Sequence, residues 1–167
     1  FQVMDQPSFD GVNTYFVSWA AAKAGLKVAI SGLGGDEIFW GYRSFRDVPL
    51  LHRLISMVYS VPFGKSVSKL LFKNGMSSRK AKLYSIIRNG PSVDRIFSVY
   101  RGLFTKDELH DMLQSDIGRE VLKESDFAIS FQDYSKIPGI HNQISFLETT
   151  HYMANQLLRD TDVFTMA

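Results

Sequence analysis

Residues 26–39, LKVAISGLGGDEIF, join a short apolar run to three glycines within four positions and then to two adjacent carboxylates. Leu26 to Ile30 is partly β-branched and has the length of a buried strand. The glycines predict a tight turn from Ser31 to Gly35. Asp36 and Glu37 are acids of the kind favoured in the first turn of a helix. The stretch therefore predicts a strand, a glycine turn and a helix from Asp36 to about Tyr42.

The residues before this stretch predict another helix. From about Asn13 to Ala24, aromatic residues share one helical face, three alanines follow, and Gly25 stands where the helix would stop. The order helix, strand, turn, helix belongs to an α/β fold with a parallel sheet. Because a single strand cannot form a sheet, its partners are expected outside these 167 residues.

The rest of the chain predicts helices. Apolar periodicity and Gly or Pro stops mark segments at 48–62, 66–75, 77–90, 92–104, 105–113, 117–134 and 141–165. Thr105 and Glu108 have the spacing of a capping box. We therefore predict a predominantly helical fragment of an α/β fold. Its expected parts are a partial core at 1–45, a helical lobe at 46–140 and a returning helical segment at 141–167.

The composition is that of a globular protein without a cysteine framework. Hydrophobic residues make up 45% of the chain, which suffices for a core, and cysteine is absent. Disulfides and thiolate metal sites are therefore excluded. No apolar stretch approaches the roughly 20 residues of a membrane span. The start, FQVMDQPSFD, has no basic leader. We expect a cytoplasmic protein of which this chain is an internal piece, with exposed sheet edges that favour homo-oligomers.

The turn after the strand suits an anionic ligand. Ligands of open α/β sheets bind at the carboxyl ends of the strands, and glycines there present backbone N–H groups. Asp36 and Glu37 would repel a bare phosphate, but they fit a Mg²⁺ ion held between carboxylate and phosphate. The spacing alone leaves a second interpretation open, in which the glycines make a turn and Asp36 caps a helix. The pattern is neither a P-loop nor a dinucleotide fingerprint.

Three ordered stretches carry a family resemblance. SGLGGDEIFWGYRSF at 31–45 resembles the signature of the synthetase domain of glutamine-hydrolysing asparagine synthetases, an SG-x-GGDE motif followed by F-x-GY. DQPSFDGVNTYFVSWAAAKAGLKVAI at 5–30 resembles the segment before that signature. HYMANQLLRDTDVFTMA at 151–167 resembles a later helix of the family. The resemblance rests on these three stretches, and the helical middle of the chain adds little to it.

The resemblance implies an ATP-pyrophosphatase fold and an ATP-dependent amide synthesis. The side-chain carboxylate of aspartate would be adenylated with release of pyrophosphate, and ammonia would then displace AMP. A glutaminase domain of the parent chain would supply the ammonia. The implied ligands are ATP and Mg²⁺. Since ammonia is the nucleophile, no catalytic side chain is assigned, and this chain alone is expected to be inactive.

Site residues follow from the matching positions. Ser31, Gly32, Leu33, Gly34 and Gly35 would line the ATP and pyrophosphate site. Asp36 would bind Mg²⁺, with Glu37 beside it. Three further aspartates could lie on the substrate side: Asp5, Asp10 and Asp162. For Asp162 a structural contact is equally open, and for Asp5 and Asp10 a role in a turn is favoured.

Two positions depart from the family pattern. Leu33 stands where many relatives have Asp or Glu, and leucine can neither titrate nor donate a hydrogen bond. Asp160 replaces a common Lys, with Arg159 one position earlier. The first phosphate loop of the family, SGG-x-DS, has no counterpart here. The departures leave open an amidotransferase acting on another carboxylate or on a sugar-linked substrate.

Two remaining patterns have simpler interpretations. A basic helical module that binds nucleic acid is a weaker alternative, because no nucleic-acid motif accompanies the cations. Those cations are Arg79, Lys80, Lys82, Arg88 and Arg95. The four histidines lack the spacing of a zinc site.

Overall fold

The computed structural model describes Ser8 and residues 10–62, 78–113, 118, 120 and 134–166. This part of the chain is mainly helical, which confirms the predicted predominance of helix, and it contains no strand. The chain forms two compact units. The first comprises Phe1–Gly41 with Ser145–Ala167, and the second comprises Tyr42–Ile144. The division into parts at 1–45, 46–140 and 141–167 remains a prediction.

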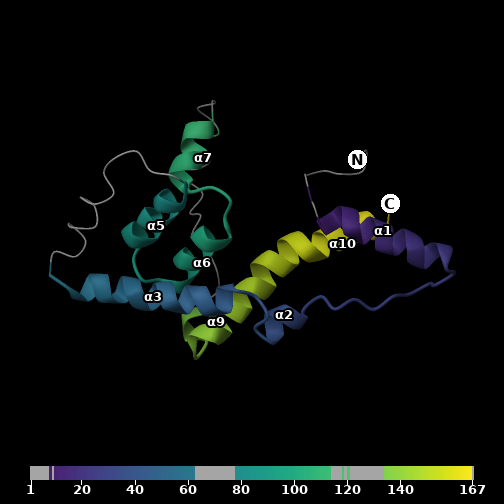
Figure 1. Cartoon of the computed structure of the whole chain (residues 1–167), viewed down its shortest axis with the longest axis horizontal. Coiled ribbons are helices and arrows are strands. Elements are labelled where there is room, and N and C mark those ends of the chain that lie inside the picture. The colour runs from purple at the N-terminus through teal and green to yellow at the C-terminus, as the bar shows by residue number, and fades with distance from the viewer. Residues whose placement is uncertain are drawn as a thin grey trace. The chain divides into compact units, whose positions relative to one another are not determined.

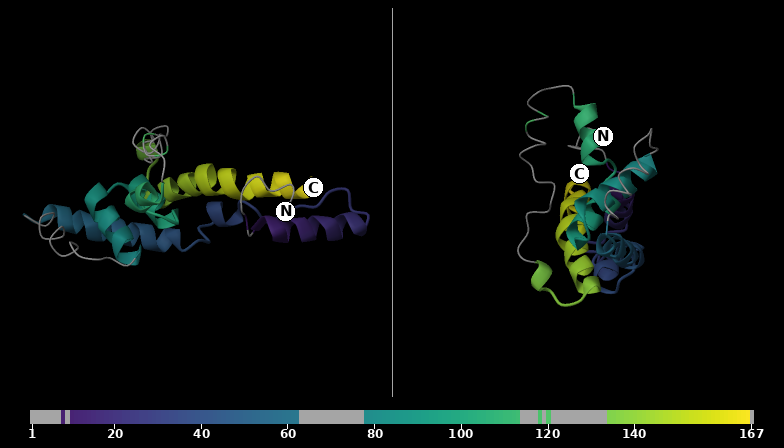
Figure 2. Two further views of the ribbon diagram at one scale, coloured as in Figure 1. Left: turned by 90° about the horizontal axis from the view of Figure 1, so that it is seen from above. Right: turned by 90° about the vertical axis from the view of Figure 1, so that its left-hand side faces the viewer.

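The first unit is built on a pair of helices from opposite ends of the chain. Helix α1, Asp10–Lys23, packs along α10, Arg159–Thr165 (Figures 1 and 2). The π-helix η2, Glu148–Leu158, runs directly into α10 and also contacts the short helix α2, Gly35–Ile38. Because α1 ends at Lys23 and Gly25 follows with a φ of 77°, the predicted helix stop is confirmed.

The predicted buried strand is wrong for this structure. Residues 26–30 have no regular secondary structure, and their apolar side chains face solvent. Leu26, Val28 and Ile30 are 59%, 81% and 98% exposed. A strand acquires its hydrogen-bond ladder and its burial only from a neighbouring strand, and none lies in the described residues.

The second unit contains a small apolar core. Helices α3, Ser44–Ser60, and α5, Ser78–Asn89, both pack on α6, Val93–Arg101. The buried side chains on these helices are Phe45, Val48, Ile55, Ile86, Val93, Ile96 and Phe97. The periodicity of the sequence therefore located these helices correctly, although α3 begins at Ser44, before the predicted 48.

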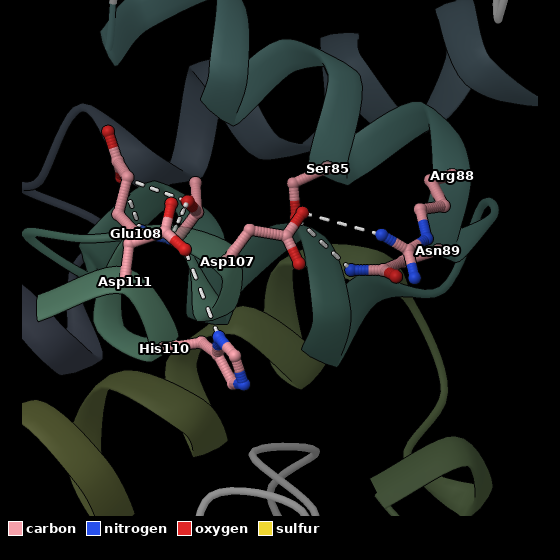
Figure 3. A network of polar contacts seen from close by, with 8 residues as sticks. Ser85, Arg88, Asn89, Asp107, Glu108, His110 and Asp111 are labelled. Atoms are coloured by element: carbon pink, nitrogen blue, oxygen red, sulfur yellow. Dashed lines mark hydrogen bonds and ion pairs between the residues drawn. The ribbon is translucent and has the colours of Figure 1, made fainter. Parts of the chain in front are cut away.

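Polar contacts fix the ends of the helices in this unit (Figure 3). Thr105 precedes α7, Lys106–Met112, and forms the predicted capping box with Glu108: the Glu108 N–H donates to Thr105 Oγ1 at 3.2 Å, and the Thr105 N–H donates to Glu108 Oε2 at 2.7 Å. Arg88 at the end of α5 pairs with Asp107 at 3.4 Å. The capping box thus confirms where the sequence predicted a helix to begin.

The remaining elements follow the predicted order. A 3₁₀ turn η1, Tyr134–Lys136, precedes α9, Ile140–Leu147, and residues 140–165 are helical in agreement with the predicted 141–165 segment. The segment at 66–75 and most of the one at 117–134 lie outside the described residues. None of the helices in the described ranges combines the length and the apolar character needed to cross a bilayer.

Candidate functional site

The glycine turn is formed as the sequence predicts. The Gly35 N–H donates to the Gly32 carbonyl at 3.3 Å, and the Leu33 N–H donates to Ser31 Oγ at 3.4 Å. Gly34 has φ 92° and ψ −16°, a left-handed conformation that L-residues with a side chain rarely adopt. A Cβ built on Gly32 or Gly35 would meet no atom within 4 Å. The backbone of the turn therefore has open space beside it.

The helix after the turn is shorter than predicted. Helix α2 ends at Ile38 rather than near Tyr42, and a single turn carries little of the helix dipole. Trp40 follows with a φ of 62° and reverses the chain, so that the Gly41 N–H donates to the Asp36 carbonyl at 2.9 Å. Any attraction of this turn for anions must therefore come from its individual N–H groups.

The two adjacent acidic residues, Asp36 and Glu37, lie in different environments. Asp36 is exposed, whereas Glu37 is 1% exposed. The Asp36 carboxylate lies against Gly41, where a built Cβ would be 2.0 Å from Asp36 Oδ1. The Glu37 carbonyl accepts a hydrogen bond from Ser145 Oγ at 2.6 Å. Asp36 is thus available to a solvent-side ligand, and Glu37 is part of the packing between α2 and the C-terminal helical run.

A pocket of about 560 Å³ opens beside the glycine turn, entirely within the first unit. One wall is the segment from Ala29 to Leu33. Helix α1 forms the second wall, and Leu157 of η2 together with helix α10 forms the third. The lining residues are Asp10, Asn13, Thr14, Val17, Ser18, Ala29, Ile30, Ser31, Gly32, Leu33, Leu157, Asp160, Thr161 and Thr165.

Asp160 is the buried acid of this pocket. It is 3% exposed and accepts a short hydrogen bond from Ser8 Oγ. Ser8 Oγ in turn accepts the Gly11 N–H at 3.0 Å. This chain of hydrogen bonds links Ser8 and the first turn of α1 to α10, and it leaves a carboxylate in the pocket wall.

The residues predicted for the site fall into separate groups. Ser31, Gly32, Leu33 and Asp10 line the pocket together. Gly34, Gly35, Asp36 and Glu37 lie beyond the pocket on the following turn and α2, and Asp162 is exposed on α10 outside the lining. Asp5 lies outside the described residues.

Few features of the sequence indicate the α10 wall of the pocket. In the sequence, Asp160 stands out only as a departure from a family pattern, and no motif includes Thr161. The Ser8–Asp160 hydrogen bond joins residues 152 positions apart, so no local pattern could reveal it.

The fit to a magnesium ion rests on Asp36 alone. No group of three His, Cys, Asp or Glu side chains that could hold a metal occurs among residues 10–62, 78–113 and 134–166 or the other described positions. Mg²⁺ on a nucleotide needs only one or two protein carboxylates, because phosphates and waters complete its octahedron. An exposed Asp36 beside an open glycine turn fits that requirement, and the buried Glu37 does not.

The cations proposed for a nucleic-acid surface mostly have partners within the chain. Lys82 Nζ donates to the Gly102 carbonyl at 2.6 Å, Arg88 pairs with Asp107, and Arg95 donates to the Asn89 carbonyl at 2.9 Å. These contacts give three of the five basic side chains a structural role within the chain.

Comparison with known protein families gives a match over the whole chain. The family model described as asparagine synthase matches the chain over residues 1–167. No curated protein and no solved structure gives a significant match.

Proposed function

Because the chain belongs to the asparagine synthase family, we propose that its glycine turn binds the phosphates of ATP for the activation of an aspartate side chain. ATP-dependent amide formation is the chemistry of this family. The single observation that carries the proposal is the open backbone of the turn between Ser31 and Gly35, next to a solvent-facing Asp36.

The conformation of the turn supports phosphate binding. Space beside Gly32 and Gly35 allows the phosphate oxygens to approach the backbone within hydrogen-bond distance, which a side chain would prevent. Successive N–H groups in such a turn form a concave site for anions. The left-handed Gly34 sets the direction of the N–H groups on either side of it.

Asp36 is the residue that would hold Mg²⁺ at this turn. The ion, when bound, supplies neutralisation of the charge that develops on the departing phosphates. The exposure of Asp36 supports this role. The absence of a side chain at Gly41 leaves the space that the Asp36 carboxylate occupies. The burial of Glu37 favours a packing role for that residue.

The proposed reaction needs positioning more than side-chain chemistry. An oxygen of the aspartate side-chain carboxylate attacks the α-phosphorus of ATP, and pyrophosphate leaves. Ammonia, supplied by glutamine hydrolysis in another domain, then attacks the activated carbonyl carbon, and AMP leaves. Both steps depend on alignment and on charge stabilisation, which the turn and Asp36 are suited to provide.

The exposed segment at 26–30 is proposed to become a strand of the synthetase sheet. Leu26, Val28 and Ile30 alternate along the chain, as the residues on one face of a strand do. Apolar side chains exposed to this degree are typical of a surface that another element covers. On this proposal, the described helices 93–101 and 106–112 belong to a helical lobe, and residues 1–45 with 141–167 belong to the core.

Titration of the chain with MgATP tests the proposal, followed by the amide NMR signals of Gly32, Gly34 and Gly35. We expect these signals to shift only when Mg²⁺ is present, and we expect Asp36→Asn to weaken binding about tenfold or more. Asp111→Asn is the matched control, because its side chain is 86% exposed in the other unit. Absence of shifts at the glycines, or equal binding by Asp36→Asn, would exclude the proposed role of the turn.

A further inference from the structure

Helix α3, in the second unit, buries one face and exposes the opposite one. Its buried apolar side chains are Phe45, Val48 and Ile55, and α6 packs on this helix (Figure 1). Leu50, Leu54 and Met57 are 49–56% exposed and follow one another at intervals of four and three residues. At about 100° per residue, they lie within about 60° of one another, on the side away from the buried three. Single apolar residues are ordinary on a surface, but a line of three on one helix face is the pattern of a contact seam.

The intervals of four and three residues are those of a coiled coil. If Leu50 and Met57 take position d of the heptad, Leu54 takes position a. Arg46 and Arg53 then fall at successive g positions, which border the seam. Both arginines are exposed, and the side chain of Arg46 is 76% exposed. These five residues together are named the α3 face.

The α3 face carries positive charge. Asp47 is the one acid in the sequence of this helix, and its carboxylate already accepts hydrogen bonds from Arg46 Nε at 2.9 Å and from Tyr100 OH at 3.0 Å. The bond to Asp47 uses one of the five N–H donors of the Arg46 guanidinium. An approaching acid would therefore meet two cations that still have donors to offer, Arg46 and Arg53.

A second copy of the chain would be a poor partner for this seam. In an antiparallel pair the g positions of the two helices face each other, which would place arginine against arginine. In a parallel pair each g position faces an e position, and the e positions here are Leu51 and Val58. Neither orientation places an acid opposite an arginine. The charge therefore selects a different helix, with acidic residues beside its own apolar seam.

We propose that the α3 face binds an amphipathic helix of a separate protein, with apolar residues at its a and d positions and two acids, seven residues apart, opposite Arg46 and Arg53. The three apolar side chains supply the buried contact, as in other helices that recognise a helical partner. The two arginines supply the choice of partner, because charges beside a seam repel wrong partners more than they add affinity. The whole face lies in the second unit, so this binding does not depend on the glycine turn.

Two synthetic helices that differ only in charge test the proposal. Each has about three heptads with Leu at a and d, and one carries Glu at e and g where its twin carries Lys. We expect the full chain to bind the Glu helix with a Kd of about 10 μM at low salt, measured by fluorescence anisotropy. The Lys helix should bind at least about tenfold more weakly, because it repels the arginines.

Substitutions in the α3 face should change this preference. Arg53→Glu leaves the Arg46–Asp47 pair in place and should reduce the preference to about one, whereas Arg46→Glu combined with Arg53→Glu should reverse it. Leu54→Gln should weaken binding of the Glu helix about tenfold, because it removes the middle apolar contact. Urea midpoints equal to that of the wild-type chain verify that these exposed positions leave the fold unchanged.

Two exposed positions of the second unit outside α3 give matched controls. Leu103→Gln and Lys106→Glu repeat the changes from apolar to amide and from cation to acid, and should leave both affinities unchanged. The MgATP titration should be the same in every variant. The proposal is overturned if the wild-type chain binds the two helices equally, if the double arginine variant keeps the preference for Glu, or if neither helix binds up to about 1 mM.

Two other occupants of the α3 face would give distinct results. Binding to vesicles of phosphatidylcholine and phosphatidylserine that Leu54→Gln abolishes, without a preference for the Glu helix, would assign the face to a membrane surface. Self-association in sedimentation experiments that Leu54→Gln abolishes would assign it to a second copy of the chain. Either result would overturn the proposal.

Discussion

The ring of Phe164 occupies the space that a side chain at Gly11 would need. A Cβ built on Gly11 would lie 2.1 Å from Phe164 Cε2 and 2.5 Å from Cδ2. Gly11 is buried in the first turn of α1, and Phe164 lies near the end of α10. The absence of a side chain at Gly11 is therefore what allows the two helices that wall the pocket to approach each other (Figure 2).

Gly11→Ala should destabilise the first unit. The added methyl group would displace the Phe164 ring or separate the helices, and overpacking of this kind costs about 1–3 kcal/mol. Unfolding by urea, followed by circular dichroism, measures the loss. Gly32→Ala is the control, because a Cβ there meets nothing within 4 Å. A Gly11→Ala chain as stable as the Gly32→Ala chain would show that the ring moves aside freely.

Thr105→Ala should destabilise the second unit through loss of the capping box. The substitution removes the acceptor of the Glu108 N–H, and the loss of an N-cap costs about 1 kcal/mol. For a chain of this length the melting temperature should fall by about 2–4 °C in calorimetry. Glu108→Gln retains an acceptor for the Thr105 N–H and should lower it less. A larger effect of Glu108→Gln than of Thr105→Ala would contradict this account.

Local patterns predicted the helices well because the signals that start and stop a helix lie in the residues at its ends. Thr105 and Glu108 predicted the start of α7, and Gly25 predicted the end of α1. The strand at 26–30 was predicted from the same kind of local signal, but it does not form, because a strand needs a partner strand, which is not restricted to neighbouring residues. Apolar residues still alternate along this segment as they do in a strand, but the segment has no partner strand in the described residues.

The candidate site was predicted at the glycine turn and at Asp10, but not on the α10 wall. The turn at Ser31–Gly35 is a contiguous motif, and its left-handed Gly34 follows from the residue type. The opposite wall depends on tertiary packing of α1 on α10, which brings Ser8 to Asp160. Nothing in the local sequence around Asp160 distinguishes a buried carboxylate from the exposed Asp162 two residues later.

Gly41→Ala should weaken MgATP binding through Asp36. A Cβ at position 41 would lie 2.0 Å from Asp36 Oδ1, so the carboxylate must rotate away from its present position. Because Asp36 is exposed, that rotation costs little stability. We expect a loss of about tenfold in MgATP affinity, with an unchanged urea midpoint.

The control for this substitution is ATP without the metal. If Gly41 acts through the carboxylate that holds Mg²⁺, binding of metal-free ATP should be equal in the wild-type and Gly41→Ala chains. A loss of stability without a change in the MgATP titration would instead assign Gly41 to the reversal of the chain at Trp40.

His151 should make the first unit less stable in mild acid. It lies half-buried in η2, and burial lowers its pKa from the ordinary value of 6.5. Between that value and the lower value of the folded state, the unfolded chain binds more protons than the folded chain. The free energy of unfolding therefore falls as the pH drops below about 6.5, until the folded His151 is also protonated. Above that range the residue contributes no pH dependence.

Urea midpoints between about pH 7.5 and about pH 5 measure this dependence, since that interval spans the titration of an ordinary histidine. His151→Gln should flatten the decline on the acid side, because glutamine has no proton to gain. His110→Gln is the matched control: its ring is 48% exposed on α7, in the other unit, and its removal should leave the decline unchanged. If the two variants and the wild-type chain lose stability in parallel, the acid sensitivity arises from other groups, and the burial of His151 does not govern it.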